Sequence, residues 1–195
     1  LTQRFAVENF AVEFQLNAAE ITWDFPTLDE RYLAPEKGVE SDDAAVVQYA
    51  KTTIAEESNP YTISRSLFSG IGRFLQYQKG TSASPSAVAA LTSGVGSCEE
   101  YTYLFVASLR ALGIPARWHS GYLYLPQEHS ASPYLNEDGS ISGDEIRHVW
   151  AEVYLPPVGW VIVDPTYSYT FINGDVTQKI VDWDKFAHIS RYERH

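Results

Sequence analysis

The sequence predicts an α+β fold in which a helix beginning at Cys98 packs against an antiparallel sheet. Helical periodicity fills residues 41–112, and alternating, strand-like segments follow it. Helices first and strands later along one chain is the order typical of this class. A chain of 195 residues, 45% of them hydrophobic, can bury one such core. The later strands are predicted at residues 118–125, 148–155, 160–163 and 186–192.

Residues 1–40 are predicted to be a β-rich N-terminal segment followed by a linker. Apolar residues alternate, with one slip, over residues 5–16, which predicts one bulged strand or two short ones. A further strand is predicted at residues 21–25. Residues 26–40 contain prolines and charges without periodicity, so we expect the linker there. The main domain is then expected over residues 41–195.

Helices are predicted ahead of the only cysteine. The first has candidate N-caps at Ser41 and Asp42 and an apolar stripe. A second is predicted over residues 60–76. A third starts with Ser84 as N-cap and a proline at the first helical position, and ends near Gly94. The stripe of the first helix consists of Val46, Val47, Ala50 and Ile54.

Cys98 is predicted to be the first residue of the next helix. Ser97 and Glu100 have the spacing of a capping box, and Gly113 ends the helix. The unpaired amides and positive dipole end of a helix favour thiolate over thiol, whereas Glu99 and Glu100 oppose it by like-charge repulsion. A lone thiol is often only a small buried hydrophobe, so a nucleophile also requires a basic partner.

The candidate partner is His148, which begins one alternating segment, while Asp164 ends the next. The aliphatic residues of both strands must share the buried face, so His148 and Asp164 lie on the same face only if the connecting loop has an odd number of residues or the hairpin contains a bulge. The three residues 156–158 meet this condition. Asp164 is then opposite Trp150, one pleat from His148, where its carboxylate can hold the far nitrogen of the imidazole.

The segments GVGSCEEYTYLFVASLRALGIPARWHSGYL and HVWAEVYLPPVGWVIVDPTY resemble the transglutaminase-like superfamily, over roughly residues 41–192. Its members have a papain-like Cys-His-Asp triad, with the nucleophile at a helix N-terminus packed on an antiparallel sheet. The resemblance implies that Cys98 is the nucleophile, His148 the base and Asp164 the orienting acid. It also implies an upstream side chain that helps the Cys98 amide to bind the oxyanion, and Tyr77 is the candidate.

The resemblance implies acyl transfer from an amide bond through a thioester. We favour a cysteine protease or amidase acting on a protein or peptide, without a cofactor. The alternatives are a protein-glutamine gamma-glutamyltransferase and a non-catalytic binding module that retains the triad. Trp150, Trp160 and Tyr122 are candidates for lining the substrate cleft, with simple packing as the competing explanation for each.

Composition argues against several other partners. A net charge of -11 disfavours attraction to nucleic acid or anionic membranes, and no apolar run of about eighteen residues is present. One cysteine allows neither an internal disulfide nor a thiolate zinc cluster. Residues 134–145 match part of a calcium loop, but Tyr134 stands where an acid is required, so we expect a solvated turn and no metal site.

Overall fold

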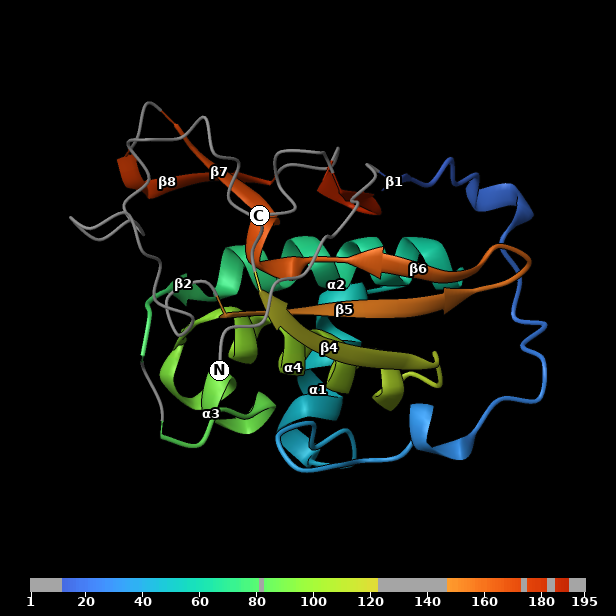
Figure 1. Ribbon diagram of the computed structural model, residues 1–195, viewed down its shortest axis with the longest axis horizontal. Helices are drawn as coiled ribbons and strands as arrows, with labels where there is room; N and C mark the ends of the chain where they lie inside the picture. The colour runs from blue at the N-terminus through green and yellow to red at the C-terminus, as the bar shows by residue number, and fades with distance from the viewer. Residues whose placement is uncertain (1–11, 81–82, 123–146, 173–174, 182–184, 190–195) are drawn as a thin grey trace, which may run out of the picture.

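The computed structural model describes residues 12–80, 83–122, 147–172, 175–181 and 185–189. An antiparallel sheet with the order β4-β5-β6 lies in front of the helices in Figure 1, so the predicted α+β class is confirmed. The helices are α1 (Ala44–Ile54), α2 (Pro60–Phe74), α3 (Ala87–Ser93) and α4 (Cys98–Ala111). The sheet strands are β4 (Ala116–Tyr122), β5 (Arg147–Leu155) and β6 (Gly159–Val163).

Shorter strand pairs surround this core. Each pair joins segments as follows: β1 (Val12–Glu13) with β9 (His188–Ile189), β2 (Gln76–Tyr77) with β3 (Val95–Gly96), and β7 (Tyr169–Ile172) with β8 (Asp175–Val181). The short 3₁₀ helices are η1 (Ala18–Glu20), η2 (Glu30–Tyr32) and η3 (Pro165–Tyr167). Within the described ranges, no helix has the length and apolar character needed to cross a bilayer.

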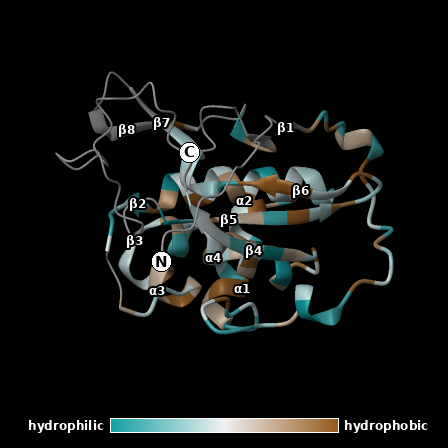
Figure 2. Cartoon of the chain, in the orientation of Figure 1, coloured by the Kyte–Doolittle hydropathy of each residue, from teal (hydrophilic) through white to brown (hydrophobic). Residues whose placement is uncertain are grey.

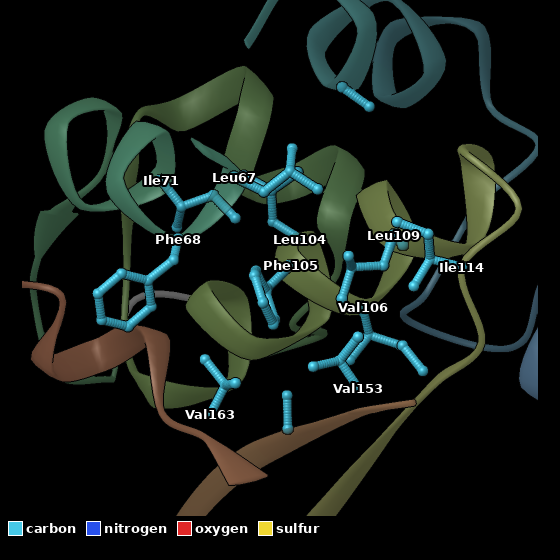
Figure 3. Packing of buried hydrophobic residues seen from close by; sticks show 14 of the residues in the cluster. Leu67, Phe68, Ile71, Leu104, Phe105, Val106, Leu109, Ile114, Val153 and Val163 are labelled. Carbon is cyan, nitrogen blue, oxygen red and sulfur yellow. The ribbon is translucent and has the colours of Figure 1, made fainter. Parts of the chain in front are cut away.

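Helix α4 lies at the centre of the molecule. Helices α1, α2 and α3 pack around it, and β5 packs against its other side. Figure 3 shows Phe105 of α4 between Leu67 and Phe68 of α2 and the sheet residues Val153 and Val163, and all five side chains are buried. Burying one such side chain contributes about 1.5–3 kcal/mol. The helix that starts at Cys98 is therefore held firmly by packing.

The register of the β5-β6 hairpin is the predicted one. Ala151 pairs with Val163 and Leu155 pairs with Gly159, which leaves three residues in the loop. The aliphatic side chains form the inner face, and the hydrophobic residues of both strands appear as brown bands in Figure 2. The outer face carries the polar and aromatic side chains together with Ile162, which is opposite Glu152. The buried inner residues are Val149, Ala151, Val153, Leu155, Val161 and Val163.

Two helix starts differ from the prediction by one or two residues. Helix α1 is capped by Asp43, not by Ser41 or Asp42, because the Asp43 carboxylate accepts a hydrogen bond of 2.8 Å from the second helical amide. Helix α3 is capped by Ser86, not Ser84, because the Ser86 hydroxyl accepts one of 3.0 Å from the third. Such hydrogen bonds satisfy amides that have no acceptor within the helix.

The predicted strand at residues 21–25 is wrong. Ile21 is buried as the residue that ends η1, and the Asn59 side-chain amide donates to its carbonyl at 2.8 Å. Trp23 Nε1 donates to the Ser58 carbonyl at 2.7 Å. The segment is thus attached to the α1-α2 connection by side-chain hydrogen bonds and not by a strand ladder.

The other outcomes at the ends of the chain are mixed. Of the predicted strand at residues 5–16, residues 12–13 form β1, and residues 1–11 lie outside the described part. Of the strand predicted at 186–192, residues 188–189 form β9 and 186–187 form a turn. The hairpin β7-β8 was not predicted. The possible calcium loop at 134–145 lies outside the described residues.

Candidate active site

Cys98 occupies the first position of α4, as the capping-box spacing predicts, and is partly exposed. The carboxylate of Glu100, which is 2% exposed, accepts hydrogen bonds of 2.8 Å from both the backbone amide and the hydroxyl of Ser97. A Cβ added at Gly96 would lie 2.5 Å from Glu100 Cβ, so only glycine fits there. The backbone that leads into Cys98 is therefore closely fixed.

The carboxylate of Glu99, beside Cys98, is paired with Arg147, whose guanidinium lies 3.2 Å from it. Arg147 directly precedes His148 on β5, so one short stretch of strand supplies both the partner of Glu99 and the imidazole. The pair is partly exposed, which limits its contribution to about 0–1 kcal/mol. It nevertheless offsets part of the repulsion that Glu99 would exert on a thiolate.

The imidazole of His148 is bound to Asp164. His148 Nε2 lies 2.5 Å from Asp164 Oδ2, and the His148 residue is 8% exposed. The other oxygen of Asp164 accepts the backbone amide of Thr166 at 3.1 Å, because Asp164 is the N-cap of η3 and Pro165 occupies its first turn. Both carboxylate oxygens are thus engaged, so the carboxylate is fixed directly after the paired residues of β6, beside His148.

Charge decides the protonation state of His148. Burial lowers the pKa of His148, but the charge of Asp164 and the hydrogen bond to it raise the pKa, and so do the hydrogen bond to Cys98 and its charge, so that the pKa reaches about 10. Because Nε2 is engaged by Asp164, Nδ1 is the nitrogen left for Cys98. At neutral pH the arrangement therefore favours an imidazolium beside the carboxylate of Asp164.

The three cleft candidates lie in different surroundings. Trp150 is stacked on His148 with ring centroids 6.5 Å apart and an interplanar angle of 21°. Tyr122, at the end of β4, is 70% exposed and pairs with Arg147 of β5. Trp160 pairs with Tyr154, six residues along β5 from His148, a separation of about 20 Å. The structure therefore does not place Trp160 beside the imidazole.

Trp160 instead belongs to a packing cluster at the far end of the hairpin. The Arg117 guanidinium carbon lies 4.1 Å from the centroid of the Trp160 ring, and the Tyr32 and Tyr154 rings meet it edge-on. Arg117 also forms an ion pair with Glu152 at 2.6 Å. These contacts attach η2 to the sheet, which is a structural role.

Tyr77 lies on the strand beside the approach to Cys98. In the parallel pair β2-β3, Tyr77 is opposite Gly96, and its side chain is 44% exposed. The Tyr101 hydroxyl, from the first turn of α4, donates to the carbonyl of Leu75 at 2.7 Å and thereby holds the residue directly before β2. Tyr77 and Cys98 are thus both connected to the same short strand pair.

Sequence reasoning missed two partners of this site. Tyr167 lies against His148, with ring centroids 5.8 Å apart, and Arg147 pairs with Glu99. The signal for Tyr167 was its place three residues after Asp164, in a turn begun by Asp-Pro. In the part of the chain that the structure covers, no group of three or more His, Cys, Asp or Glu residues is arranged to hold a metal ion.

The sequence profile of the transglutaminase-like superfamily matches residues 47–165, more than half of the chain. The chain belongs to this superfamily. A protein-glutamine gamma-glutamyltransferase from Pseudomonas aeruginosa is 37% identical over 73 residues, 37% of this chain and 10% of the relative. The uncharacterized protein Rv2569c from Mycobacterium tuberculosis is 31% identical over 127 residues, 63% of this chain and 38% of the relative.

Solved structures show the same transglutaminase-like fold. A candidate cysteine protease from Cytophaga hutchinsonii has a TM-score of 0.55 at 23% identity, covering 82% of this chain and 45% of that one. The periplasmic domain of TgpA from Pseudomonas aeruginosa, bound to ethylmercury, has a TM-score of 0.52 at 25% identity, covering 70% of this chain and 48% of that one. The chain therefore spans less than half the length of each of these relatives.

Proposed function

We propose that this transglutaminase-like protein is a thiol enzyme that transfers the acyl group of an amide bond. Cys98 is the nucleophile, His148 the acid and base, and Asp164 the group that orients His148. One observation carries the proposal: the His148 imidazole is hydrogen-bonded to Asp164, and Cys98, at the start of α4, bears on the same imidazole and helps to raise its pKa. A nucleophile, a base and an orienting group within hydrogen-bonding reach is the arrangement that such catalysis requires.

In the first half of the reaction, the Cys98 thiolate attacks the amide carbonyl carbon and a C–S bond forms. The negative charge moves to the carbonyl oxygen. The His148 imidazolium then gives its Nδ1 proton to the nitrogen as the C–N bond breaks, so the amine leaves neutral and a thioester remains on Cys98. Asp164 stabilises the imidazolium before this transfer and keeps Nε2 protonated after it.

The oxyanion requires hydrogen-bond donors near the sulfur. The backbone amide of Cys98 is one, because amides in the first turn of a helix have no acceptor within it and add to the positive dipole end. Tyr77 is the proposed second donor, supported by its position opposite Gly96, two residues before the nucleophile. Donors of this kind act most strongly when they are fixed in advance.

The second half of the reaction resolves the thioester. Water or an amine attacks the thioester carbonyl, neutral His148 accepts the proton, and the C–S bond breaks to restore the thiolate. We place hydrolysis first, as in a cysteine protease or amidase, because water needs no site of its own. Transfer to an amine is the second candidate, and the similarity to the Pseudomonas aeruginosa protein-glutamine gamma-glutamyltransferase favours it.

An assay on a glutamine-containing protein with a labelled primary amine separates these outcomes. Incorporation of the amine with release of ammonia indicates transferase activity, new N-termini indicate proteolysis, and ammonia release alone indicates amidase activity. Cys98→Ala and His148→Ala are the matched inactive variants. Intact-mass detection of an acyl group on the wild type and not on Cys98→Ala would support the thioester.

The competing view is a binding module that retains these three residues without catalysis. Iodoacetamide labelling of Cys98 across pH distinguishes it from the enzyme. An ion-paired thiol reacts well below its ordinary pKa of about 8.5, and His148→Ala restores ordinary behaviour. A thiol that already behaves ordinarily in the wild type, together with no acyl intermediate, would refute the proposed function.

A further inference from the structure

Trp150 is stacked on two histidines on the outer face of the sheet. Its ring centroid lies 5.8 Å from that of His119 and 6.5 Å from that of His148, with an interplanar angle of 21° in both cases. These separations fall within the range of offset stacking between aromatic rings. His119 is directly opposite Trp150 on β4, whereas His148 precedes Trp150 by one pleat on β5.

The position of the indole depends on a glycine. Gly121 is opposite His148 in the β4-β5 ladder. A Cβ added at Gly121 would lie 2.9 Å from Trp150 Cη2 and 3.1 Å from Cζ3. The indole therefore occupies the space above the Gly121 backbone that a side chain at this position would fill. A larger residue at position 121 must displace the indole.

The other end of the stack is fixed by charge. His119 Nε2 lies 3.0 Å from Glu152 Oε2, and Arg117 binds the same oxygen at 2.6 Å. Glu152 is directly opposite Arg117 in the ladder, and its side chain is 15% exposed. The orientation of the His119 ring is thus set by a carboxylate that is itself held in place.

We propose that Trp150 is a positioning residue for His148: its indole, held by Gly121 and His119, sets the plane of the imidazole so that Nδ1 faces Cys98 while Nε2 stays on Asp164. The role rests on the proposed function, because it matters for catalysis only if Cys98 is the nucleophile. The last torsion of a histidine side chain is broad. The hydrogen bond to Asp164 fixes the position of Nε2 but leaves the tilt of the imidazole plane open, and stacking on Trp150 constrains that tilt.

Other groups around His148 do not duplicate this constraint. Tyr167 meets the imidazole at a 46° tilt with the centroids 5.8 Å apart, so it covers the ring without matching its plane. The titratable groups that bear on the imidazole are Asp164 and Cys98, while Arg147 and Glu99 pair with each other alongside. Displacing the indole therefore changes the orientation of His148 and leaves its charge partners in place.

Gly121→Ala tests the inference without altering His119, Trp150 or any of the three proposed catalytic residues. The matched control is Ser120→Ala, at the adjacent exposed position whose side chain belongs to the other face. Displacing the indole removes the stacking that holds the His148 imidazole, so the imidazole leaves its preferred rotamer. We therefore expect iodoacetamide labelling of Cys98 at pH 6 to slow by about 3- to 10-fold in Gly121→Ala. Ser120→Ala should match the wild type.

Trp150→Phe and Trp150→Leu form a second pair. Phenylalanine keeps a flat ring, so Trp150→Phe should preserve most of the labelling rate. Trp150→Leu should slow labelling of Cys98 to a similar extent as Gly121→Ala. Near-ultraviolet circular dichroism checks that each variant is folded. Should Gly121→Ala fail to fold, the comparison of phenylalanine with leucine decides the question alone.

The inference is overturned if folded Gly121→Ala and Trp150→Leu both keep the wild-type pH profile of labelling and the wild-type nuclear magnetic resonance signals of His148. It is also overturned if an active enzyme shows only a raised KM in these variants, since that result would make Trp150 part of the substrate cleft. Neither iodoacetamide labelling nor the nuclear magnetic resonance measurement needs a substrate. A failure of acyl transfer in the wild type can therefore be told apart from a failure of this inference.

Discussion

Replacing Asp164 by asparagine removes a charge while keeping the shape of the side chain. In the wild type, one carboxylate oxygen binds His148 Nε2 and the other accepts the amide of Thr166 at the start of η3. Asparagine can still accept from Thr166 through Oδ1, but its NH2 group then faces His148. An imidazole that accepts this bond at Nε2 must carry its proton on Nδ1, so the imidazolium is no longer favoured.

The size of the effect follows from the charge on Asp164. The pKa of His148 is about 10 against an ordinary 6.5, a difference that corresponds to about 5 kcal/mol between the two protonation states. Burial opposes this rise, and Asp164 is the first cause of it, ahead of Cys98. We expect Asp164→Asn to lower the pKa of His148 by about 1 to 3 pH units.

The same change alters how stability depends on pH. Because the pKa of folded His148 lies above its unfolded value, the stabilisation is fully present below pH 6.5 and is lost as the pH rises towards about 10. The wild type should therefore lose unfolding free energy between these two pH values, through this histidine, and Asp164→Asn should lose much less.

Nuclear magnetic resonance titration of the His148 ring measures the pKa directly, and urea unfolding at pH 6 and pH 10 measures the stability. If the imidazolium activates Cys98 as proposed, iodoacetamide labelling of Cys98 at pH 6 should be slower in Asp164→Asn than in the wild type. If His148 titrates at the same pH in both proteins, the carboxylate is not the source of the raised pKa, and the electrostatic account of this site is wrong.

Three further substitutions test other parts of the structure. Cys98→Ala should lower the pKa of His148, but by less than the loss of the carboxylate does, because the thiol is the smaller cause; an unchanged titration would contradict their contact. Tyr77→Phe should reduce kcat by about 10²-fold if its hydroxyl binds the oxyanion, with little change in urea stability because the side chain is 44% exposed. Glu36→Gln should destabilise the fold by about 1.5–3 kcal/mol, since Arg110, whose side chain is 2% exposed, loses its 2.8 Å ion pair; equal unfolding midpoints would refute this.

The features that were predictable from the sequence have few alternatives. A strand has only two faces, so the aliphatic residues of β5 and β6 could share the core in one parity alone, and the loop of residues 156–158 selected it. The capping box is similarly restrictive, because Ser97 and Glu100 must be three residues apart. Both constraints act locally, and both bear directly on Cys98, His148 and Asp164.

The errors occurred where several local solutions compete. Cap-forming residues occur side by side before α1, and only the structure shows that it is Asp43 whose carboxylate accepts the amide of Ala45. The alternation at residues 21–25 is short, and hydrogen bonds from Asn59 and Trp23 hold that segment without any neighbouring strand. The hairpin β7-β8 contains a register shift at 171–172, which interrupts the alternation that would have indicated it.

The three-residue connection between β5 and β6 has a consequence for natural variation in this protein. A slip of the strand pairing by one residue would turn Asp164 toward the helices and Val163 toward solvent, whereas a change of turn length that keeps Leu155 opposite Gly159 leaves both side chains where they are. Homologous chains should therefore vary in the length of this surface turn more freely than in the pairing of the two strands that it joins.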